Sequence, residues 1–330
     1  MKRPTKRTPG LRLLAALPVV AVLTVSCGLG GSSGSSTSAD TGKGSIAKDF
    51  DFSGAKFTVG SKEFTENVIL GKITIDALRA AGATVTDRTK LTGSTVVRDA
   101  LTNGDIDMYW DYAGTGWSLY LHHDTPVDGA TAQFQATAEE DLKTNGVKWL
   151  GPAKFGDQYA IAMRQNAPGE LGQVSSLSDL ATYVAAHPKD ATFCGASEFF
   201  DRRFPAFEST YQVKFPKDQV HTNDLALDYT NVSKGKPCNF AEVFTTDARI
   251  KTQNLKVLTD DKGVFLTQLA TLTTTKAIFD KYPKLDELAK TLGDKLTAEE
   301  MIDLNKMVDV DGKTAEQAAQ SFLSKFGFVA

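Results

Sequence analysis

Hydrophobic positions in the first third of the chain change repeatedly between a two-residue period and a helical period. Residues 56–60 alternate as a strand, and a mixed apolar face then predicts a helix that ends near Ala81. A second strand is expected over 83–89, a short helix over 93–104 and a third strand over 105–112. Strands that alternate with helices in this way predict a parallel α/β sheet.

The rest of the chain continues with mixed patterns and ends in helices. Residues 198–211 favour a helix that is interrupted at Pro205, and residues 223–232 are ambiguous. Thr297–Glu300 forms a capping box at the start of one C-terminal helix. The remaining expected strands are 147–150, 159–163, 191–194, 241–247 and 254–258, and the remaining expected helices are 131–145, 177–186, 277–281, 285–292, 297–308 and 314–326.

The third strand ends at a glycine-rich turn. It carries Tyr109, Trp110 and Tyr112 and stops at Gly114 and Gly116. This arrangement leaves a ring, a hydroxyl and bare backbone amides at one edge of the sheet, where the ligand crevices of open α/β sheets lie. On composition alone, a buried strand with a simple hairpin turn explains the same residues, so a functional interpretation needs support from the rest of the chain.

The N-terminal segment has the features of an export signal. Basic residues lie near the start, and the apolar run 13–25 is much shorter than a membrane span. Residues 1–26 are therefore expected to be a signal peptide. Cys27 follows a stretch similar to a bacterial lipoprotein processing site, although such sites usually have leucine in place of Thr24. Residues 27–54, which begin with many Gly, Ser and Thr residues, are then expected to be a flexible tether, and plain secretory cleavage is the alternative.

The composition is that of an ordinary globular protein. The chain has 330 residues, of which 41% are hydrophobic and 23% charged, enough for two lobes or domains. The whole chain has a net charge of −3, and loss of the basic residues of the signal peptide makes it more acidic. An acidic chain argues against nucleic acid as a partner, because nucleic acid binds basic surfaces.

The cysteine content indicates one disulfide. Apart from Cys27, the chain contains Cys194 and Cys238, an even number in an exported protein. We therefore predict a bond between these two residues, which would stabilise the fold by roughly 4 kcal/mol through the chain entropy of the closed loop. Two buried free thiols are the alternative interpretation.

Five segments together carry a family resemblance. They are Ser61–Gly71 (SKEFTENVILG), Asp107–Thr115 (DMYWDYAGT), Phe244–Asp247 (FTTD), Leu258–Asp261 (LTDD) and Leu304–Asp309 (LNKMVD). In this order and spacing they resemble the glycine betaine/choline/carnitine-binding proteins of ABC importers, over about residues 56–328. The resemblance implies an α/β fold of the type II periplasmic-binding-protein class, with two lobes that close like a Venus flytrap.

The resemblance also implies a domain organisation. The chain is expected to cross twice between the lobes, with lobe 1 at 55–156 plus 262–330 and lobe 2 at 157–261. A solute would lie in the cleft between the lobes, and a hinge motion would close them over it.

For the binding site, the resemblance implies a cage of aromatic rings around a quaternary ammonium and polar donors around a carboxylate. A cation without N–H groups cannot donate hydrogen bonds, so ring faces bind it, at roughly 0.5–2 kcal/mol per contact. A carboxylate favours a planar two-pronged donor such as arginine. The residues at the matching positions are Tyr112, Tyr159 and Phe244 for the cage, Asp157 for a backbone carbonyl that faces the cation, and Lys62, Thr115 and Arg202 for the carboxylate.

Three departures from the family pattern leave the solute open. Phe244 stands where the family has a cage tyrosine, and Gln268 falls where it often has another, although Phe265 would compensate. The segment around Arg202 lacks the usual Asp-Gly after the arginine, so Arg203 is an alternative ligand. A thinner cage leaves a less methylated or larger compatible solute as an alternative.

The resemblance implies a monomeric extracytoplasmic protein, anchored to the outer face of the cell membrane by a lipid on Cys27. It would capture glycine betaine or a related osmoprotectant and deliver it to ABC permease subunits served by a separate ATPase. Choline, carnitine, ectoine-like compounds and polyols are alternative solutes. An exported enzyme is a further alternative, but the chain shows no P-loop and no H-E-x-x-H. No cofactor is expected, and no metal site, because adjacent His122 and His123 project divergently.

Overall fold

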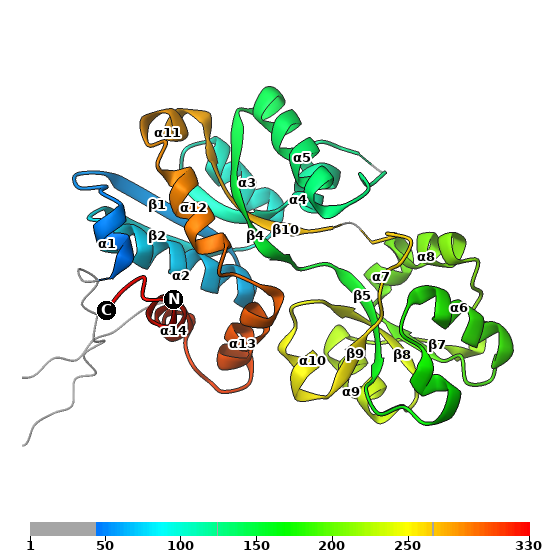
Figure 1. The fold of residues 1–330 in the computed structure, drawn as a ribbon. Coiled ribbons are helices and arrows are strands. Elements are labelled where there is room, and N and C mark those ends of the chain that lie inside the picture. Colours follow the sequence, from blue (N-terminus) through cyan, green and yellow to red (C-terminus); the bar gives the residue numbers. More distant parts are fainter. Residues whose placement is uncertain (1–43, 124, 266) are drawn as a thin grey trace, which may run out of the picture. The chain divides into compact units, whose positions relative to one another are not determined.

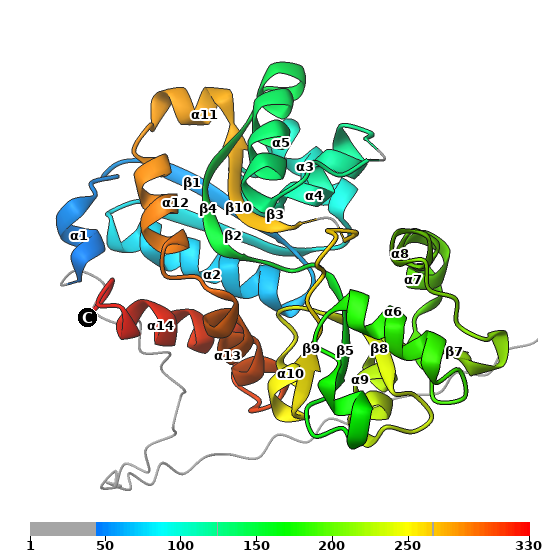
Figure 2. The same ribbon diagram turned by 45° about the vertical axis from the view of Figure 1, so that its right-hand side comes forward.

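Two mixed sheets underlie the fold. The computed structural model describes residues 44–123, 125–265 and 267–330 (Figures 1 and 2). The strand orders are β2–β1–β3–β10–β4 in the first sheet and β7–β6–β8–β5–β9 in the second. The first sheet consists of β1 (Lys56–Lys62), β2 (Thr84–Leu91), β3 (Met108–Tyr112), β4 (Val147–Gly156) and β10 (Leu269–Thr275). The second consists of β5 (Tyr159–Arg164), β6 (Phe193–Gly195), β7 (Val220–Thr222), β8 (Phe240–Phe244) and β9 (Leu255–Val257).

Each sheet combines parallel and antiparallel pairs. Strand β1 is parallel to β2 and β3, which confirms the parallel arrangement predicted for the first three strands, whereas β10 is antiparallel to β3 and β4. In the second sheet, β6 is parallel to β7 and β8, and β5 is antiparallel to β8 and β9. The chain passes from the first sheet to the second between β4 and β5 and returns between β9 and β10. Two crossovers therefore connect the sheets.

Helices cover both faces of the first sheet. One face packs against α2 (Thr65–Ala80), α12 (Leu285–Gly293), α13 (Ala298–Asp309) and α14 (Ala315–Lys325), and the other against α3 (Ser94–Thr102) and α5 (Ala130–Asn145). The alternation of β3 supplies both cores, because Trp110 and Tyr112 lie in the first and Tyr109 in the second. The strand begins at Met108 and not at the predicted Asp105, because the Asp105 and Ile106 N–H groups donate to the Ala100 carbonyl at the end of α3, at 2.8 and 3.1 Å.

Shorter helices complete the part of the fold around the first sheet and also surround the second sheet. They are α1 (Ser45–Asp49), α4 (Ala113–Thr115), the π-helix η2 (Gly116–Tyr120), α11 (Lys276–Lys281), the 3₁₀ helices η3 (Gly169–Gln173) and η4 (Lys217–Gln219), α6 (Leu177–Ala186), α7 (Ser197–Arg202), α8 (Phe204–Tyr211), α9 (Leu225–Lys234) and α10 (Ala248–Thr252). Pro205 lies in the first turn of α8, which confirms the predicted interruption, and the ambiguous segment 223–232 forms most of α9.

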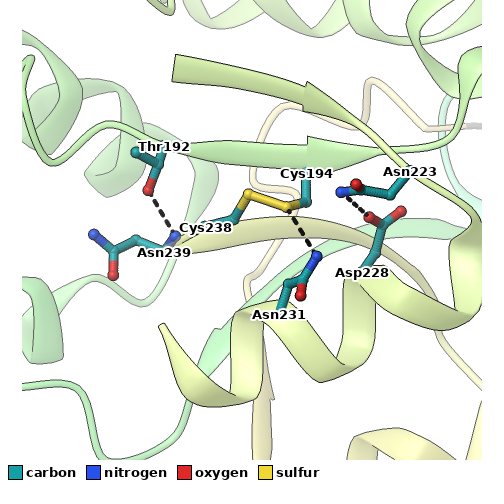
Figure 3. Close-up of a disulfide and its surroundings, with 7 residues drawn as sticks. All are labelled: Thr192, Cys194, Asn223, Asp228, Asn231, Cys238 and Asn239. Atoms are coloured by element: carbon teal, nitrogen blue, oxygen red, sulfur yellow. Dashed lines mark hydrogen bonds between the residues drawn. A yellow bond between two sulfur atoms is a disulfide. The ribbon is translucent and has the colours of Figure 1, made fainter. Parts of the chain in front are cut away.

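Phenylalanine rings form much of the core of the second sheet, and a disulfide ties two of its segments. Phe193 of β6 packs against Phe199, Phe204 and Phe215 with ring centroids 5.0–5.9 Å apart. The predicted bond between Cys194 of β6 and Cys238 before β8 is confirmed, with the two Cα atoms 5.7 Å apart (Figure 3). Strands β6 and β8 are thus held by both backbone hydrogen bonds and a covalent link.

The predicted tether over 27–54 is wrong for its last part. Ile46, Phe50 and Phe52 are buried in the core of the first sheet. The Ser45 N–H donates to the Gly327 carbonyl at 2.9 Å, which attaches this segment to the C-terminal end of the chain. Although the preceding residues are mostly polar, these three apolar side chains pack into the core and order the segment. Residues 1–43, including the predicted signal peptide and Cys27, lie outside the described residues.

Candidate functional site

The first group of predicted site residues lies at the carboxyl ends of β1 and β3. Lys62 ends β1, and its Nζ donates to Asp111 Oδ1 of β3 at 2.7 Å. Both side chains are buried, with exposed fractions of 5% and 0%. The Lys62 ammonium also lies 5.1 Å from the centroid of the Tyr112 ring. Lys62 and Tyr112 are thus brought together, and Asp111 is the counter-ion that fixes the lysine.

Further hydrogen bonds fix the position of Asp111 and of the β1 end. Asp111 accepts from the Tyr109 hydroxyl at 2.5 Å and from the Tyr112 N–H at 2.8 Å. Asn67, in the first turns of α2, accepts from the Lys62 N–H at 2.6 Å and donates to the Trp110 carbonyl at 2.8 Å. The start of α2 is therefore bonded to both strands, which holds Lys62 and Tyr112 in one rigid corner.

The Tyr112 hydroxyl connects this corner to helix α13. It donates to Glu66 Oε1 of α2 at 2.6 Å, and Asn305 Nδ2 of α13 donates to Glu66 Oε2 at 3.3 Å. The same Asn305 amide donates to the Thr246 carbonyl, in the turn after β8, at 3.0 Å. Burial raises the pKa of Glu66, while hydrogen bonds from Thr246, Tyr112 and Asn305 act in the opposite direction.

Asp157 lies in the first crossover, next to the turn that follows β8. The Thr246 hydroxyl donates to Asp157 Oδ1 at 2.9 Å. The preceding Thr245 donates its hydroxyl to the Gly156 carbonyl at 2.7 Å and its N–H to the Gln158 carbonyl at 3.1 Å. Burial and the nearby Glu66 carboxyl hold the pKa of Asp157 well above its usual range. The turn and the crossover therefore position a second carboxyl near the first.

The predicted cage residues of the second sheet lie side by side. Tyr159 begins β5 and is the register partner of Phe244, the last residue of β8. Their ring centroids are 4.6 Å apart, and Phe199 continues the row at 5.6 Å from Tyr159. On the first-sheet side, Phe64 lies 6.0 Å from Tyr112. Three rings thus lie in a row on the side of the second sheet, and Phe64 at the start of α2 pairs with Tyr112 of the first sheet.

Thr115 is bonded to the second crossover. Its N–H and its hydroxyl both point to Gln268 Oε1, at 3.0 and 3.4 Å. Gly114 allows this approach, because a Cβ built there would lie 2.9 Å from both the Gln268 Cδ atom and the Thr267 carbonyl oxygen. Gln268, noted as a departure from the family pattern, is therefore the partner of a predicted ligand residue.

Three candidates remain, namely the alternative arginines Arg202 and Arg203 and the substitute ring Phe265. Arg202 ends α7, and its side chain lies outside the described part of the structure. The alternative Arg203 is half-buried. Phe265, proposed above as a substitute ring, is 3% exposed and packs 6.0 Å from Phe199 in the second core. The choice between the two arginines therefore stays a prediction.

A cavity of about 370 Å³ joins residues from both sheets. Phe64 and Phe244 contribute rings to its lining, and the predicted residue Asp157 also lines it. Besides these, its polar lining consists of Thr65, Glu66, Thr246, Asp247, Asn305 and Asp309. Among the described lining residues there is no lysine or arginine, so the surroundings favour a cation.

Sequence reasoning missed Glu66, Thr246 and Asn305 as members of the site. All three lie in segments that carry the family resemblance, but their side chains meet only in three dimensions. Their location within segments that match the family is the sequence signal that could have identified them. Chemically, the group offers rings, carboxyls and an amide, which suits recognition of an organic cation. Within the described residues, no group of three or more His, Cys, Asp or Glu side chains is placed to hold a metal ion.

Comparisons with known proteins agree with this chemistry. Residues 55–325 match the family model for the substrate binding domain of ABC-type glycine betaine transport systems. The chain is similar to the glycine-betaine-binding protein of Pseudomonas aeruginosa, with 33% identity over 272 residues, covering 80% of this chain and 86% of that protein. It is also 31% identical over 272 residues to the ergothioneine transport permease/ergothioneine binding protein EgtU of Helicobacter pylori, covering 82% of this chain but only 47% of that longer protein.

A solved structure gives the same result for the fold. The chain is similar to apo YehZ from Escherichia coli, with a TM-score of 0.73 and 26% identity. The match covers 83% of this chain and 99% of that chain. The two sheets and both crossovers described above lie inside the matched family region.

Proposed function

Because the chain belongs to the family of substrate-binding domains of ABC-type glycine betaine transport systems, we propose that it captures glycine betaine or a related quaternary-ammonium osmoprotectant for import. Its fold is the two-lobed α/β fold of type II periplasmic binding proteins, as predicted. The P. aeruginosa relative carries the same solute in its name. The protein itself is expected to perform no chemistry.

The observation that carries this proposal is the cavity that Asp157 and Phe244 line together with Phe64. A trimethylated cation needs ring faces and negative partial charge, and both are present there. The Tyr159 and Phe244 ring centroids are 4.6 Å apart, and those of Tyr112 and Phe64 are 6.0 Å apart. We infer that these four rings and the Asp157 carbonyl hold the ammonium end of the solute.

The carboxylate end is assigned to Lys62, Thr115 and Arg202. Lys62 donates one of its three N–H groups to Asp111, which leaves two for a solute. Thr115 lies in the glycine-rich turn that follows β3, near the same strand end. An arginine adds the planar donor that a carboxylate favours. These three roles depend on the family resemblance and on the clustering of the β1 and β3 ends.

We further propose that the mature protein acts outside the cytoplasm as a monomer, held to the membrane by a lipid on Cys27. The proposed partners are ABC permease subunits and their separate ATPase. Within the described residues, none of the helices has the length and hydropathy that a membrane crossing requires. Labelling with a palmitate analogue in a bacterial host, with a Cys27→Ala variant as control, tests the lipid anchor.

Isothermal titration calorimetry with glycine betaine tests the proposal. Tyr112→Ala removes a cage ring and is expected to weaken binding more than tenfold, because several ring contacts of roughly 0.5–2 kcal/mol act together. Tyr112→Phe is the matched control, since it keeps the ring and loses only the hydroxyl that donates a hydrogen bond to Glu66.

The same titration distinguishes the alternative solutes. Choline, carnitine, an ectoine-like compound, a polyol and ergothioneine are titrated in parallel. Binding of only a polyol, or of none of the quaternary-ammonium compounds, would refute the proposed solute class. A turnover screen with the same compounds, analysed by mass spectrometry, would show any product that contradicts a pure binding role.

A further inference from the structure

The two ends of the Gln268 side-chain amide have different surroundings. Gln268 is half-buried and lies in the second crossover, directly before β10. Its Oε1 atom accepts from the Thr115 N–H at 3.0 Å and faces the Thr115 hydroxyl at 3.4 Å. Because a backbone N–H only donates, this bond fixes which end of the amide meets Thr115 and leaves the Nε2 end for another partner.

The Nε2 end is accessible to solvent. Among the described residues, Gln268 Nε2 has no hydrogen-bond partner. The side-chain atoms that are both unpaired and sealed from solvent in that part of the chain are Arg98 Nη1, Asp228 Oδ2, Thr267 Oγ1 and Asn305 Oδ1. Gln268 Nε2 is not one of them, so a molecule that enters from solvent can reach it. An amide nitrogen carries two N–H groups, and these are then available to a bound acceptor.

Two glycines place Gln268 between the glycine-rich turn and the first crossover. On one side, a Cβ built at Gly114 would lie 2.9 Å from Gln268 Cδ. On the other, Leu269 is the register partner of Gly156, and a Cβ built at Gly156 would lie 2.5 Å from the Gln268 carbonyl oxygen. Gly156 directly precedes Asp157, which lines the cavity. Gln268 therefore lies between the turn that carries Thr115 and the segment that carries Asp157.

We propose that Gln268 Nε2 donates a hydrogen bond to the carboxylate of the captured solute, beside the Thr115 hydroxyl. Gln268 is then a specificity-determining residue, which favours quaternary-ammonium solutes that carry a carboxylate over those that carry only a hydroxyl. The physical reason is that a hydrogen bond to an ionised acceptor is about twice as strong as one to a neutral acceptor. This inference depends on the proposed function, because it takes the quaternary-ammonium solute and the role of Thr115 as its premises.

The hydrogen bonds of Thr115 are compatible with this role. Its N–H bond to Gln268 Oε1 has an ordinary length of 3.0 Å, whereas the contact from its hydroxyl is long, at 3.4 Å. The hydroxyl can therefore turn toward a carboxylate while the N–H keeps the Gln268 amide in place. Gln268 Nε2 and the Thr115 hydroxyl then act as two neutral donors to the same acceptor group.

Calorimetric titration of the mature chain with glycine betaine and with choline tests this role. Both solutes carry the same trimethylated cation, but only glycine betaine has a carboxylate. Gln268→Met keeps the length of the side chain and removes the amide. It is expected to weaken glycine betaine binding at least about tenfold, because a charge-assisted hydrogen bond is lost. Choline binding is expected to weaken less than about threefold, since its hydroxyl is a neutral acceptor.

Gln268→Glu distinguishes a donor to the solute from simple support of the turn. Glutamate keeps an oxygen that accepts from the Thr115 N–H, but it replaces the Nε2 donor by a second oxygen. This variant is therefore expected to bind glycine betaine at least as weakly as Gln268→Met does, whereas a residue that only supports the turn would tolerate the change. Gln135→Glu, the same change at an exposed position in α5, is the matched control and should leave both affinities unchanged.

The outcomes separate this inference from the proposed function. Wild-type affinity for glycine betaine in either Gln268 variant, or an equal loss of both solutes in Gln268→Met, overturns the inference and leaves the proposed function intact. Tighter binding of choline than of glycine betaine by the wild type overturns the preference for a carboxylate in the same way. Where circular dichroism shows that one Gln268 variant is unfolded, the other decides. A wild type that binds no quaternary-ammonium compound overturns the proposed function itself.

Discussion

The two sheets fix their parts of the site by different means. Around β1 and β3, buried charge and hydrogen bonds hold the residues, as in the Lys62–Asp111 pair. Around β6 and β8, aromatic rings and the Cys194–Cys238 bond do so. The first arrangement is sensitive to the loss of a single charged group, because the partner stays buried. The second spreads its stabilisation over many ring contacts and one covalent link.

The comparison also separates structural charges from functional ones. Asp111 has a lysine partner at 2.7 Å and two further donors, so its charge is already balanced by the protein. Glu66 and Asp157 have no such partner among the described residues. A balanced buried charge contributes to rigidity, whereas an unbalanced one in a cavity is available to a cationic ligand.

Removal of Asp111 tests whether buried charge holds the residues around β1 and β3, and it is expected to have the largest effect on stability. Asp111→Ala leaves Lys62 buried without a counter-ion, which costs roughly 3–5 kcal/mol in the free energy of unfolding. Urea denaturation followed by circular dichroism measures the loss. The double variant Lys62→Met/Asp111→Leu removes both charges and should recover much of it. A single variant as stable as the wild type would show that the pair does not fix this corner.

Loss of the disulfide tests the second half. Cys194→Ser/Cys238→Ser opens a loop with a sequence separation of 44 residues and is expected to lower the free energy of unfolding by about 4 kcal/mol in the chain-entropy model. Denaturant unfolding with and without dithiothreitol measures it, since the wild type should respond to the reductant and the variant should not. Equal midpoints under all four conditions would contradict the role assigned to this bond.

A smaller, pH-dependent effect is expected from Asp228 of α9, near the disulfide (Figure 3). Burial raises the pKa of Asp228 to about 6. The folded state then holds this proton more tightly than the unfolded chain, so Asp228 opposes folding above about pH 6 and its cost fades as the pH falls toward 4. Asp228→Asn should raise the free energy of unfolding by about 3 kcal/mol at pH 8 and by less at pH 4.

The control for Asp228 is an acid on the surface. Asp218→Asn changes an exposed carboxyl in η4 and should leave the pH profile almost as it is. Thermal unfolding at several pH values compares the three proteins. A wild-type profile without the expected rise in stability between pH 8 and pH 5, relative to Asp228→Asn, would count against a buried carboxyl that titrates near 6.

Local patterns in the sequence were sufficient for most elements of the fold. Helix α2, strand β3 and the N-cap at Thr297 follow from spacing over a few residues, and these signals do not depend on distant contacts. The full capping box predicted at Thr297 is not formed, because the Glu300 carboxylate accepts from Lys325 Nζ instead. The disulfide followed from a count of cysteines and the export signal. Helix α1 was missed because its five residues are too few for a periodic signal, and Ile46, Phe50 and Phe52 are buried only against distant residues.

Local sequence patterns predicted less of the site than of the fold. Glu66 and Asn305 are 239 positions apart, and no periodicity links residues at that distance. Likewise, Lys62 was predicted as a ligand donor from its motif, but its pairing with Asp111 across two strands is a property of the sheet register. The predicted roles of Lys62, Thr115 and Arg202 stay predictions, and binding measurements have to decide them.

Gly114 has a consequence for efforts to redesign this protein. Its backbone lies so close to Gln268 that the turn carrying Thr115 and the second crossover fit together without space for even a methyl group. A new specificity at Thr115 therefore cannot be reached by changing that turn alone. Library designs that vary residues 113–116 and 267–268 jointly should yield folded proteins more often than designs that vary either segment separately.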